Sequence, residues 1–532
     1  MNKWKFSYWW RNNSFAKFWN KLTHWRKRTN KVRLIFFTYL LIIVISAILL
    51  LSPATHNNTQ NGWKEVSVID AFFISASAFS DTGLVTRSTY DTWNIFGQTI
   101  IAILIFVGGV GIFALKIYLI NFFFFRNHRI SLNQINLAST ERTAVNGREA
   151  KKIITDSVSS LLIIFLVSAL GLSFYFYFAA PRQIGEITAS LDPKTNLMIN
   201  QSAQYAEIGK FISPHQNWGL SFRYGFFHSL SALNNAGFDI IGQNSLFAYY
   251  HNVELQVFFL ILFLIGGLGY TVIHDILNYF RFKIHNKGRK YHWQLLTKIS
   301  ISTYLIVTLI GFLTIIIFQT MSNGTFWTND ASFYGSKAKK IWAILFTTFS
   351  SRSAGFATLP IKNLGAPSIF LISILMFIGA GPASTGGGIR TTSFAILLIT
   401  LFSRLLGRPS VRVFKRRIGD TTVRNSFTVF LTSLILVILV ALIISTSSQN
   451  ISGNAPIDQI NFNNYIFEAS SAFGTAGLTA GVTDHLNNPG KIAMTILMFI
   501  GQLGVSSSIL VWGKKRNYSY KYEYLTEDVV IG

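Results

Sequence analysis

Residues 69–84 read IDAFFISASAFSDTGL, a run of apolar and small residues that ends in a glycine followed by a large apolar residue. The same pattern returns three times, in YGFFHSLSALNNAGF (224–238), AILFTTFSSRSAGF (343–356) and NYIFEASSAFGTAGL (464–478). A second cluster of small residues follows each run at a similar distance. These clusters begin at Gly108, Gly266, Gly379 and Gly501. Such self-similarity predicts a fold built from four copies of one unit.

Long apolar stretches flank the four runs, and each has the length of about 20 residues that crosses a ~30 Å hydrocarbon core. The runs that end in glycine are shorter and have the length of re-entrant half-helices. The sequence therefore predicts an all-α membrane protein of four pseudo-repeats, each a spanning helix, a re-entrant loop and a second spanning helix. The predicted spans lie near 33–52, 95–125, 158–180, 253–280, 299–320, 368–402, 427–446 and 491–512.

The charge pattern predicts how these spans are oriented. The chain carries 47 Lys and Arg against 21 Asp and Glu, a net charge of +26, although only 13% of its residues are charged. Basic residues gather at both termini and in alternate loops, which is the positive-inside pattern and places those parts in the cytoplasm. We therefore attribute the charge to membrane topology and expect no nucleic-acid partner. The basic loops are 126–152, 281–298 and 403–424, and the nearly neutral ones are 53–70, 181–211 and 447–463.

Composition and motifs also exclude several classes of chemistry. The chain has no cysteine, which excludes disulfide scaffolds, cysteine nucleophiles and iron–sulfur sites. It has no G-x-S-x-G, H-E-x-x-H or Walker motif, so no enzymatic site stands out. Tryptophans interleave with lysines before Arg33, which is typical of a segment lying on anionic lipid. An integral-membrane enzyme acting on amphipathic substrates stays open as a remote alternative.

Four glycine turns at equivalent depth would bring backbone carbonyl oxygens around one axis. Irregular backbone is tolerated at membrane depth only where protein or a water-filled cavity satisfies it. Rings of carbonyl oxygens can replace the hydration shell of a potassium-sized ion, and glycine adopts backbone angles that other residues resist. The half-helices would also turn their negative C-terminal ends toward the ion. The repeats therefore predict one central pore that conducts cations.

The motifs SALNNAGFD, SRSAGF, SAFGTAGLT and GPASTGGGIRTTSF resemble those of the Trk/Ktr/HKT superfamily of potassium transporters, and among them the Ktr-type (KtrB-like) membrane subunit. The resemblance covers residues 33–512. It implies eight transmembrane helices in a fourfold pseudosymmetric monomer, a homodimer in the plasma membrane, and K⁺, with Na⁺ as the alternative ion, as the bound species. It implies no organic cofactor in this chain and a separate cytoplasmic RCK-type ring that binds nucleotide.

In this family the selectivity filter comprises the glycine of each repeat and its neighbours. A serine in place of the first glycine often accompanies Na⁺ preference, so Gly83 favours K⁺ here. Carried onto this chain, the filter consists of Asp81, Thr82, Gly83 and Leu84, of Asn235, Ala236, Gly237 and Phe238, of Ser353, Ala354, Gly355 and Phe356, and of Thr475, Ala476, Gly477 and Leu478.

Residues 379–392 read GAGPASTGGGIRTT where a spanning helix is expected. Proline lacks an amide donor and clashes with the preceding turn, and each glycine costs about 1 kcal/mol relative to alanine in a helix. The segment therefore predicts a break, with a merely kinked helix as the alternative. The family resemblance implies an intramembrane gating loop, in which Arg390 either opposes K⁺ or ties the loop to nearby oxygens. The implied gating residues are Gly381, Pro382, Gly386, Gly387, Gly388 and Arg390.

Three polar residues resemble family positions that support the filter. We expect Arg352 to brace the third filter loop through backbone hydrogen bonds, and His228 and Glu468 to be satisfied structural groups, with a proton relay as the alternative. Two residues depart from the family pattern. Asp81 is a carboxylate where many relatives are uncharged, and it either raises cation affinity or caps its half-helix. Gln502 stands where the fourth inner helix commonly has an arginine.

The expected function is potassium uptake through this filter. The alternatives are Na⁺-selective transport and K⁺ transport coupled to H⁺ or Na⁺. The expected divisions of the chain are a basic aromatic N-terminus (1–32), pore repeats at 33–126, 153–283, 297–404 and 425–513, the gating loop 379–392 within the third repeat, and a cytoplasmic tail (514–532).

Overall fold

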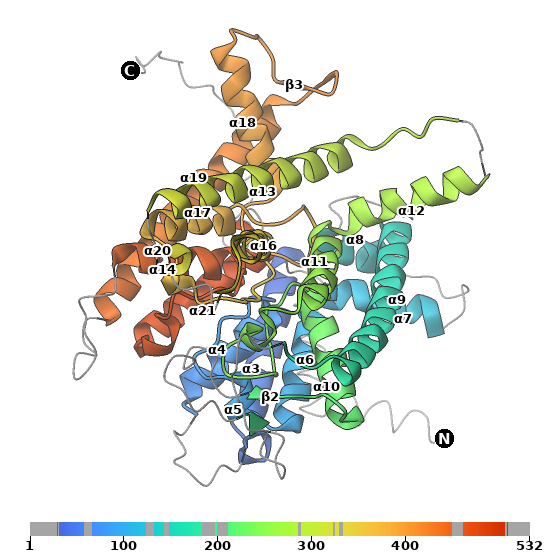
Figure 1. Ribbon diagram of the computed structural model, residues 1–532. Helices are drawn as coiled ribbons and strands as arrows, with labels where there is room; N and C mark the ends of the chain where they lie inside the picture. The colour runs from blue at the N-terminus through green and yellow to red at the C-terminus, as the bar shows by residue number, and fades with distance from the viewer. Residues whose placement is uncertain are drawn as a thin grey trace, which may run out of the picture.

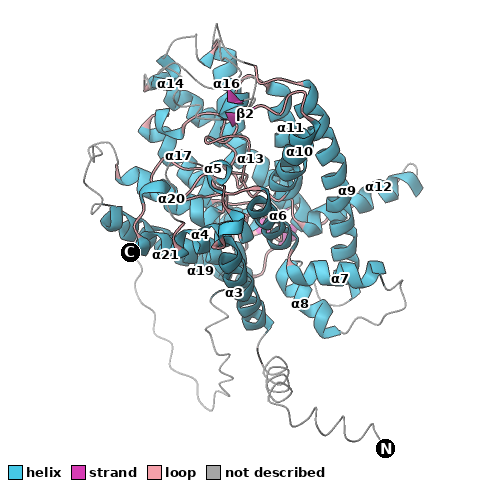
Figure 2. Ribbon diagram, turned by 90° about the horizontal axis from the view of Figure 1, so that it is seen from below, coloured by secondary structure: helices cyan, strands magenta, loops and turns pink. Residues whose placement is uncertain are grey.

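The part of the chain that the computed structural model describes is mainly helical, with two short antiparallel strand pairs (Figure 2). The residues that it describes are 29, 31–57, 66–123, 132–142, 148–182, 197–198, 211–285, 289–322, 325–328, 334–448, 461–505 and 508. The N-terminal segment before residue 29 and the expected tail 514–532 lie outside the described residues.

The expected unit occurs four times in the order of elements (Figure 1). Each copy begins with a long helix, which is followed by a short helix and a glycine loop. The long helices are α3 (Lys31–Leu50), α9 (Arg148–Phe178), α13 (Leu295–Met321) and α19 (Asp420–Ser448). The short helices are α4 (Val68–Phe79), α10 (Trp218–Leu233), α16 (Lys337–Ser350) and α20 (Phe462–Gly474).

Polar caps and apolar interiors account for the short helices. The Ser67 side chain accepts a hydrogen bond from the Asp70 amide at the start of α4, and Asn217 does the same for Leu220 in α10. Such caps satisfy amides that have no partner within the helix. The short helices lie deep in the protein, since Phe73 and Phe79 are no more than 1% exposed.

Among the described residues, the second helix of each of the first three units is divided into two helices. In the first, α6 (Ile95–Val110) and α7 (Ile112–Phe123) meet at 85°, and in the second, α11 (Val253–Gly267) and α12 (Tyr270–His285) meet at 103°. In the third, the chain leaves helix between α17 (Ala366–Phe377) and α18 (Thr391–Leu405). The fourth copy has α21 (Asn488–Leu503).

The sharp bends in the first two copies differ from the sequence expectation, which treated 95–125 and 253–280 as continuous spans. Glycine explains the difference. Gly111 ends α6 with a φ of 86°, and Gly269 precedes α12 with a φ of 83°. A glycine in this left-handed conformation ends a helix, because other residues meet a steric penalty there. Gly504 has the same φ of 83° at the end of α21.

Shorter elements lie within and between the units. One of them, the β3–β4 hairpin, projects together with α18 from the rest of the protein at the top of Figure 1. In the hairpins, Leu197 pairs with Ile212 and Arg412 pairs with Arg417 in antiparallel register. These elements are η1 (Pro53–Thr55), α5 (Thr89–Thr92), α8 (Leu132–Arg142), β1 (Leu197–Met198), β2 (Phe211–Ile212), η3 (Phe247–Tyr249), α14 (Thr325–Thr328), η4 (Ile361–Asn363), β3 (Arg412–Val413), β4 (Arg416–Arg417) and η7 (Thr483–His485).

The four long helices have the length and apolarity needed to cross a membrane, and counting each bent pair as one span gives up to six crossings among the described residues. Their apolar side chains face outward, as Ile48 (62% exposed), Val167 (66%) and Leu309 (58%) show. Large apolar side chains on an outer surface indicate contact with another apolar medium. The long helices thus form an outer wall suited to lipid, while the short helices and glycine loops lie inside.

Candidate functional site: a ring of four glycine turns

The glycines of the four turns lie against one another in a closed ring. Each has a left-handed backbone, with φ of 86°, 70°, 79° and 81° in chain order. A methyl carbon added to any of them would lie within 3.0 Å of the carbonyl oxygen that precedes the glycine of the following repeat. These contacts run from Gly83 to Ala236, from Gly237 to Ala354, from Gly355 to Ala476 and from Gly477 to Thr82. Because the last contact returns to the first repeat, we call this arrangement the glycine ring.

Each short helix ends at the glycine ring. In the first, second and fourth repeats the amide before the glycine donates to a serine carbonyl five positions earlier, as from Ala476 to Ser471 at 2.9 Å. In the third repeat Ala354 donates to Ser350, four positions earlier, at 2.8 Å. The C-terminal end of a helix carries partial negative charge. Four such ends directed at one ring favour a cation there.

The large apolar residues that follow the ring glycines point into the core. Phe356 is fully buried and stacks on Phe263, with ring centroids 5.6 Å apart. The Ser350 hydroxyl donates to the Phe356 carbonyl at 2.6 Å, and Ser231 does the same for Phe238 at 2.7 Å. Leu84 and Leu478 are equally buried. These side chains pack behind the ring, and sequence reasoning missed the serines because many serines occur in the same runs.

The residues two positions before the ring glycines form a second layer, and all four have a positive φ. Their side chains are no more than 2% exposed. The Asn235 amide and the Ser353 hydroxyl are hydrogen-bonded at 3.2 Å. The Thr475 hydroxyl accepts from the Gly387 amide at 2.6 Å, and Asp81 Oδ2 accepts from Gln502 Nε2 at 3.3 Å. This layer therefore faces the 378–390 loop and the end of α21. We call this side of the glycine ring its loop side.

The 378–390 loop is held by backbone hydrogen bonds to the repeats on either side of it. Gly381 donates to the Gly267 carbonyl at 3.0 Å, and Tyr270 donates to the Ala383 carbonyl at 3.2 Å, both at the bend of the second repeat. Gly388 donates to the Phe473 carbonyl at 3.0 Å, at the end of the fourth short helix. The loop thus lies across the loop side of the ring from the second repeat to the fourth.

Small residues allow the loop to lie this close. A methyl carbon on Gly386 would overlap the Ser353 side chain, and one on Gly387 would overlap Thr475. Gly388 has a φ of 74°, which favours glycine. The Pro382 carbonyl packs against Gly269. All the residues predicted for the gating loop therefore lie together beside the ring.

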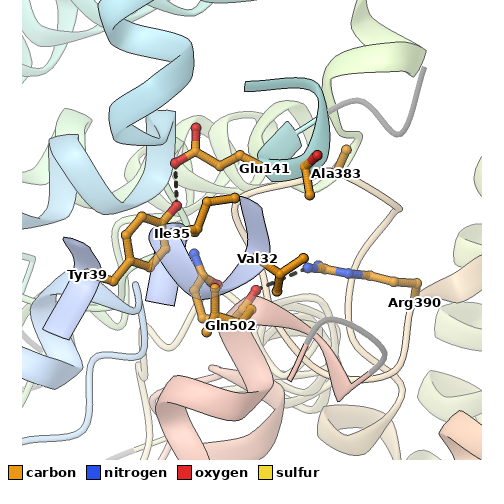
Figure 3. A pocket seen from close by; sticks show the side chains of 9 residues that line it. Val32, Ile35, Tyr39, Glu141, Ala383, Arg390 and Gln502 are labelled. Atoms are coloured by element: carbon orange, nitrogen blue, oxygen red, sulfur yellow. Dashed lines mark hydrogen bonds between the residues drawn. The ribbon is translucent and has the colours of Figure 1, made fainter. Parts of the chain in front are cut away.

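Arg390 closes the loop and lines a cavity on its far side. Its guanidinium donates to the Gly386 carbonyl and, at 3.4 Å, to the main-chain carbonyl of Gln502. The cavity has a volume of about 50 Å³, and Glu141 and Tyr39 line the wall opposite Arg390 (Figure 3). The Glu141 carboxylate accepts from the Tyr39 hydroxyl and caps the start of α7. Sequence reasoning missed Glu141, because nothing local marks its position.

Arg352 is buried at 1% exposure, and its guanidinium makes hydrogen bonds to backbone, as expected. It donates to the carbonyls of Leu375, at 3.3 Å, and Gly379, at 2.9 Å, at the end of α17. Its guanidinium also lies over the Tyr304 ring at 5.2 Å. Arg352 therefore ties the third turn to the helix end from which the 378–390 loop starts.

His228 and Glu468 occupy equivalent places in the second and fourth short helices. The Glu468 carboxylate accepts from the Thr479 and Thr483 hydroxyls, both at 2.6 Å, and from two backbone amides. His228 lies within hydrogen-bond distance of the Tyr224 carbonyl (2.7 Å) and of the Ile240 amide (3.4 Å). Both side chains link a short helix to the chain just beyond the glycine ring.

The second clusters of small residues pack against the ends of the short helices. A methyl carbon on Gly108, Gly266 or Gly501 would overlap a carbonyl oxygen in the last turn of the short helix of the same repeat. In the third repeat, Gly379 packs instead against the carbonyl of Gly387 in the loop. The glycines of these second clusters therefore allow close backbone packing beside the ring.

The first and fourth repeats are also joined by a buried ion pair that sequence reasoning missed. Lys491 Nζ lies 2.6 Å from Asp70 Oδ1, and the Asp70 side chain is 2% exposed. The two residues are 421 positions apart in the sequence. An acidic residue at the start of an apolar helix was the available signal, but it does not identify its partner.

Comparison with known proteins agrees with this architecture. Residues 11–520 match the TrkH family, described as a cation transport protein. The Ktr system potassium uptake protein D of Bacillus subtilis is 30% identical over 94% of this chain and 97% of its own length. The potassium/sodium uptake protein NtpJ of Enterococcus hirae is 29% identical over 95% of this chain and 98% of its own length. The crystal structure of the potassium transporter TrkH from Vibrio parahaemolyticus covers 90% of this chain and 84% of its own, with a TM-score of 0.56 and 16% identity.

The fold and these matches define a membrane protein of the cation-transporter class. The chain belongs to the TrkH cation transport family. The resemblance to the Trk/Ktr transporters and the prediction of an all-α membrane fold are confirmed. This is a family of transporters rather than enzymes.

Proposed function

We propose that this protein takes up potassium through the glycine ring, which serves as its selectivity filter. The observation that carries the proposal is the closed cycle of backbone contacts among Gly83, Gly237, Gly355 and Gly477. Such a cycle surrounds an axis with carbonyl oxygens, the donors that replace the hydration shell of K⁺. The filter would comprise the glycines with the two residues before and the one residue after each of them, as listed from the sequence.

The 378–390 loop is the proposed gate. It crosses the loop side of the ring and hydrogen-bonds to Gly267, Phe473 and Thr475, so an ion leaving the ring meets the loop backbone. Conduction would require these bonds to break or to shift. Arg390 anchors the loop at its last residue.

The bound ion is K⁺ in this proposal, and no organic cofactor is assigned to the chain. Two relatives support K⁺, one named for potassium uptake and one for potassium/sodium uptake. The second name favours Na⁺, or K⁺ coupled to Na⁺, as the other candidate for this chain. Gly83, a glycine in the first repeat as in the other three, favours K⁺.

Topology and partners complete the proposal. Eight crossings result if each second helix counts as a span in spite of its break, with both termini in the cytoplasm of a plasma-membrane protein. We further propose a homodimer and a separate RCK-type ring that binds nucleotide on the cytoplasmic side. The basic loop 403–424, which contains the exposed β3–β4 hairpin, is a surface available to such a ring.

Rubidium flux into proteoliposomes and growth rescue of a cell deficient in potassium uptake test this function together. We expect Rb⁺ flux that K⁺ inhibits more strongly than Na⁺, and rescue at low external K⁺. Gly83→Ser should shift the preference toward Na⁺. Absence of both flux and rescue from the wild-type protein would overturn the proposal, and an unchanged K⁺/Na⁺ preference in Gly83→Ser would overturn the filter assignment.

A further inference from the structure

We propose that Asp81 forms a cation site on the loop side of the glycine ring, and that Gln502 couples this site to Arg390 of the 378–390 loop. This inference rests on the proposed function, since its ligand is the transported ion. It goes further by assigning a gating role to the ion itself. Three side chains from the first turn, the end of α21 and the loop carry it.

The first observation is the place of an acidic side chain. Asp81 is completely buried and lies two positions before Gly83, in the layer that faces the loop. The other members of this layer, Asn235, Ser353 and Thr475, are uncharged. A carboxylate in a low-dielectric interior attracts cations far more strongly than one in water. An ion that has passed the ring would therefore meet Asp81 next.

The second observation concerns the oxygens beside this carboxylate. Gln502 Nε2 donates to Asp81 Oδ2 at 3.3 Å. Gln502 Oε1 is buried and, within the described part of the chain, makes no hydrogen bond. Buried polar atoms are nearly always satisfied, so one that is not calls for an explanation. A cation bound between the Asp81 carboxylate and this amide oxygen would explain the missing hydrogen bond.

The third observation is the link to the loop. The main-chain carbonyl of Gln502 accepts from Arg390 Nη2 at 3.4 Å, while Arg390 Nη1 donates to Gly386 within the loop. One residue of α21 thus contacts both the carboxylate below the ring and the guanidinium of the loop. A cation at Asp81 would offset the attraction between this carboxylate and the guanidinium. Ion binding would therefore weaken the anchor of the loop.

The cavity beyond the loop gives the ion a place to go. Arg390 and Gln502 line it on one side and Glu141 on the other (Figure 3). Its volume of about 50 Å³ is large enough to hold water molecules. Release of Arg390 would join the Asp81 site to this cavity. Occupancy of Asp81 and opening of the loop are then two coupled equilibria.

The test combines Asp81→Asn with Arg390→Gln in the full-length protein and measures Rb⁺ flux against Rb⁺ concentration. We expect Asp81→Asn to raise the half-maximal Rb⁺ concentration about tenfold, as the loss of one favourable charge interaction predicts. Arg390→Gln should lower that concentration several-fold when Asp81 is present and change it less than twofold in the Asp81→Asn background. The control is Asp420→Asn, which removes a carboxylate that is 80% exposed.

A second readout keeps the proposal testable if Asp81→Asn transports poorly. Rb⁺ should raise the Tm of the purified wild-type protein, since a ligand that binds the folded state stabilises it. Asp81→Asn and Gln502→Leu should both lose part of this increase. Equal half-maximal concentrations and equal Tm increases in wild type and Asp81→Asn would overturn the inference and leave the proposed function standing. A wild-type protein with neither flux nor stabilisation would overturn the proposed function instead.

Discussion

The third and fourth repeats follow the same plan and differ where the third supplies the loop. In the fourth repeat α21 runs unbroken from Asn488 to Leu503, and Gly501 packs against the end of its own short helix. In the third, helix stops at Phe377 and resumes at Thr391, and Gly379 packs against Gly387. Glycines at equivalent positions thus pack against a short helix in the fourth repeat and against the loop in the third.

The fourth repeat also binds the third repeat's loop through hydrogen bonds. The carbonyl of Phe473 and the hydroxyl of Thr475 accept hydrogen bonds from Gly388 and Gly387. The turn of the third repeat departs from the others as well, since Ser353 has a φ of 127° where Thr475 has 46°. Four similar sequences therefore form a closed ring whose turns differ in backbone conformation and in contacts, and these differences lie on the loop side.

The largest effect should come from the ring glycines, where the two repeats are alike. Gly355→Ala and Gly477→Ala each place a methyl group on a neighbouring carbonyl oxygen at a positive φ. We expect each to lower Rb⁺ flux at least about 100-fold, because a distorted ring loses its ion coordination. Gly481→Ala is the matched control, with a φ of 88° and no atom within 4 Å. Comparable loss in the control would show that backbone strain alone, rather than the ring, is responsible.

A smaller effect should separate the two repeats at Arg352. Arg352→Met removes two buried hydrogen bonds from the end of α17, whereas the end of α21 accepts one from Arg390, at the Gln502 carbonyl. We expect a loss of about 3 kcal/mol in the free energy of unfolding, since bonds to a charged donor contribute about 1.5–3 kcal/mol each. We also expect increased basal flux as the loop loosens. Thermal unfolding and flux measure these, with the exposed Arg424→Met as control; an unchanged basal flux would separate Arg352 from gating.

Substitution of Glu468 should have a smaller effect than substitution of Arg352. Glu468 also distinguishes the third and fourth repeats, because the third repeat has Phe346 at the equivalent position. Glu468→Gln keeps the oxygen that accepts from Thr479 and two amides, and its new amide can donate to Thr483. We expect a change of at most about 1 kcal/mol in stability and unchanged selectivity. Glu468→Leu leaves these donors unsatisfied, so it should lower both the stability and the ion selectivity more than Glu468→Gln does. Equal selectivity for the two variants would mean that the link beyond the ring is unnecessary.

The smallest effect should distinguish two serines in the short helices. The Ser350 hydroxyl donates to the Phe356 carbonyl, whereas the Ser471 hydroxyl has no hydrogen-bond partner among the described residues. Ser350→Ala should therefore destabilise by about 1 kcal/mol and Ser471→Ala by close to zero. Thermal unfolding of the two variants side by side measures the difference. A larger cost for Ser471→Ala would contradict the unequal turns described above.

The repeat itself was predictable from the sequence, because glycine and small residues at regular spacing have few structural explanations when four copies agree. The break in 378–390 was also accessible, since proline and three consecutive glycines oppose helix wherever they occur. The bends at Gly111 and Gly269 were missed for the converse reason. A single glycine is tolerated within a helix, and only the surrounding packing selects the left-handed conformation found here.

The roles of individual polar residues were less accessible. Backbone hydrogen bonds were expected for Arg352, but the sequence did not identify their acceptors, which lie at the end of α17. Asp81 was left between raising cation affinity and capping its helix, and its contact with Gln502 places it below the ring. A long side chain can reach many backbone oxygens, and sequence position does not choose among them.

The sequence by itself determined the class of protein, the four units and the members of the ring, because hydropathy, charge and glycine spacing act locally and repeat. Only the tertiary structure decided that the four turns close on one another, that the loop lies between the second and fourth repeats, and that Asp81 meets Gln502. Those contacts join residues as far as 421 positions apart. Their partners are set by packing of the whole chain, on which local preference carries no information.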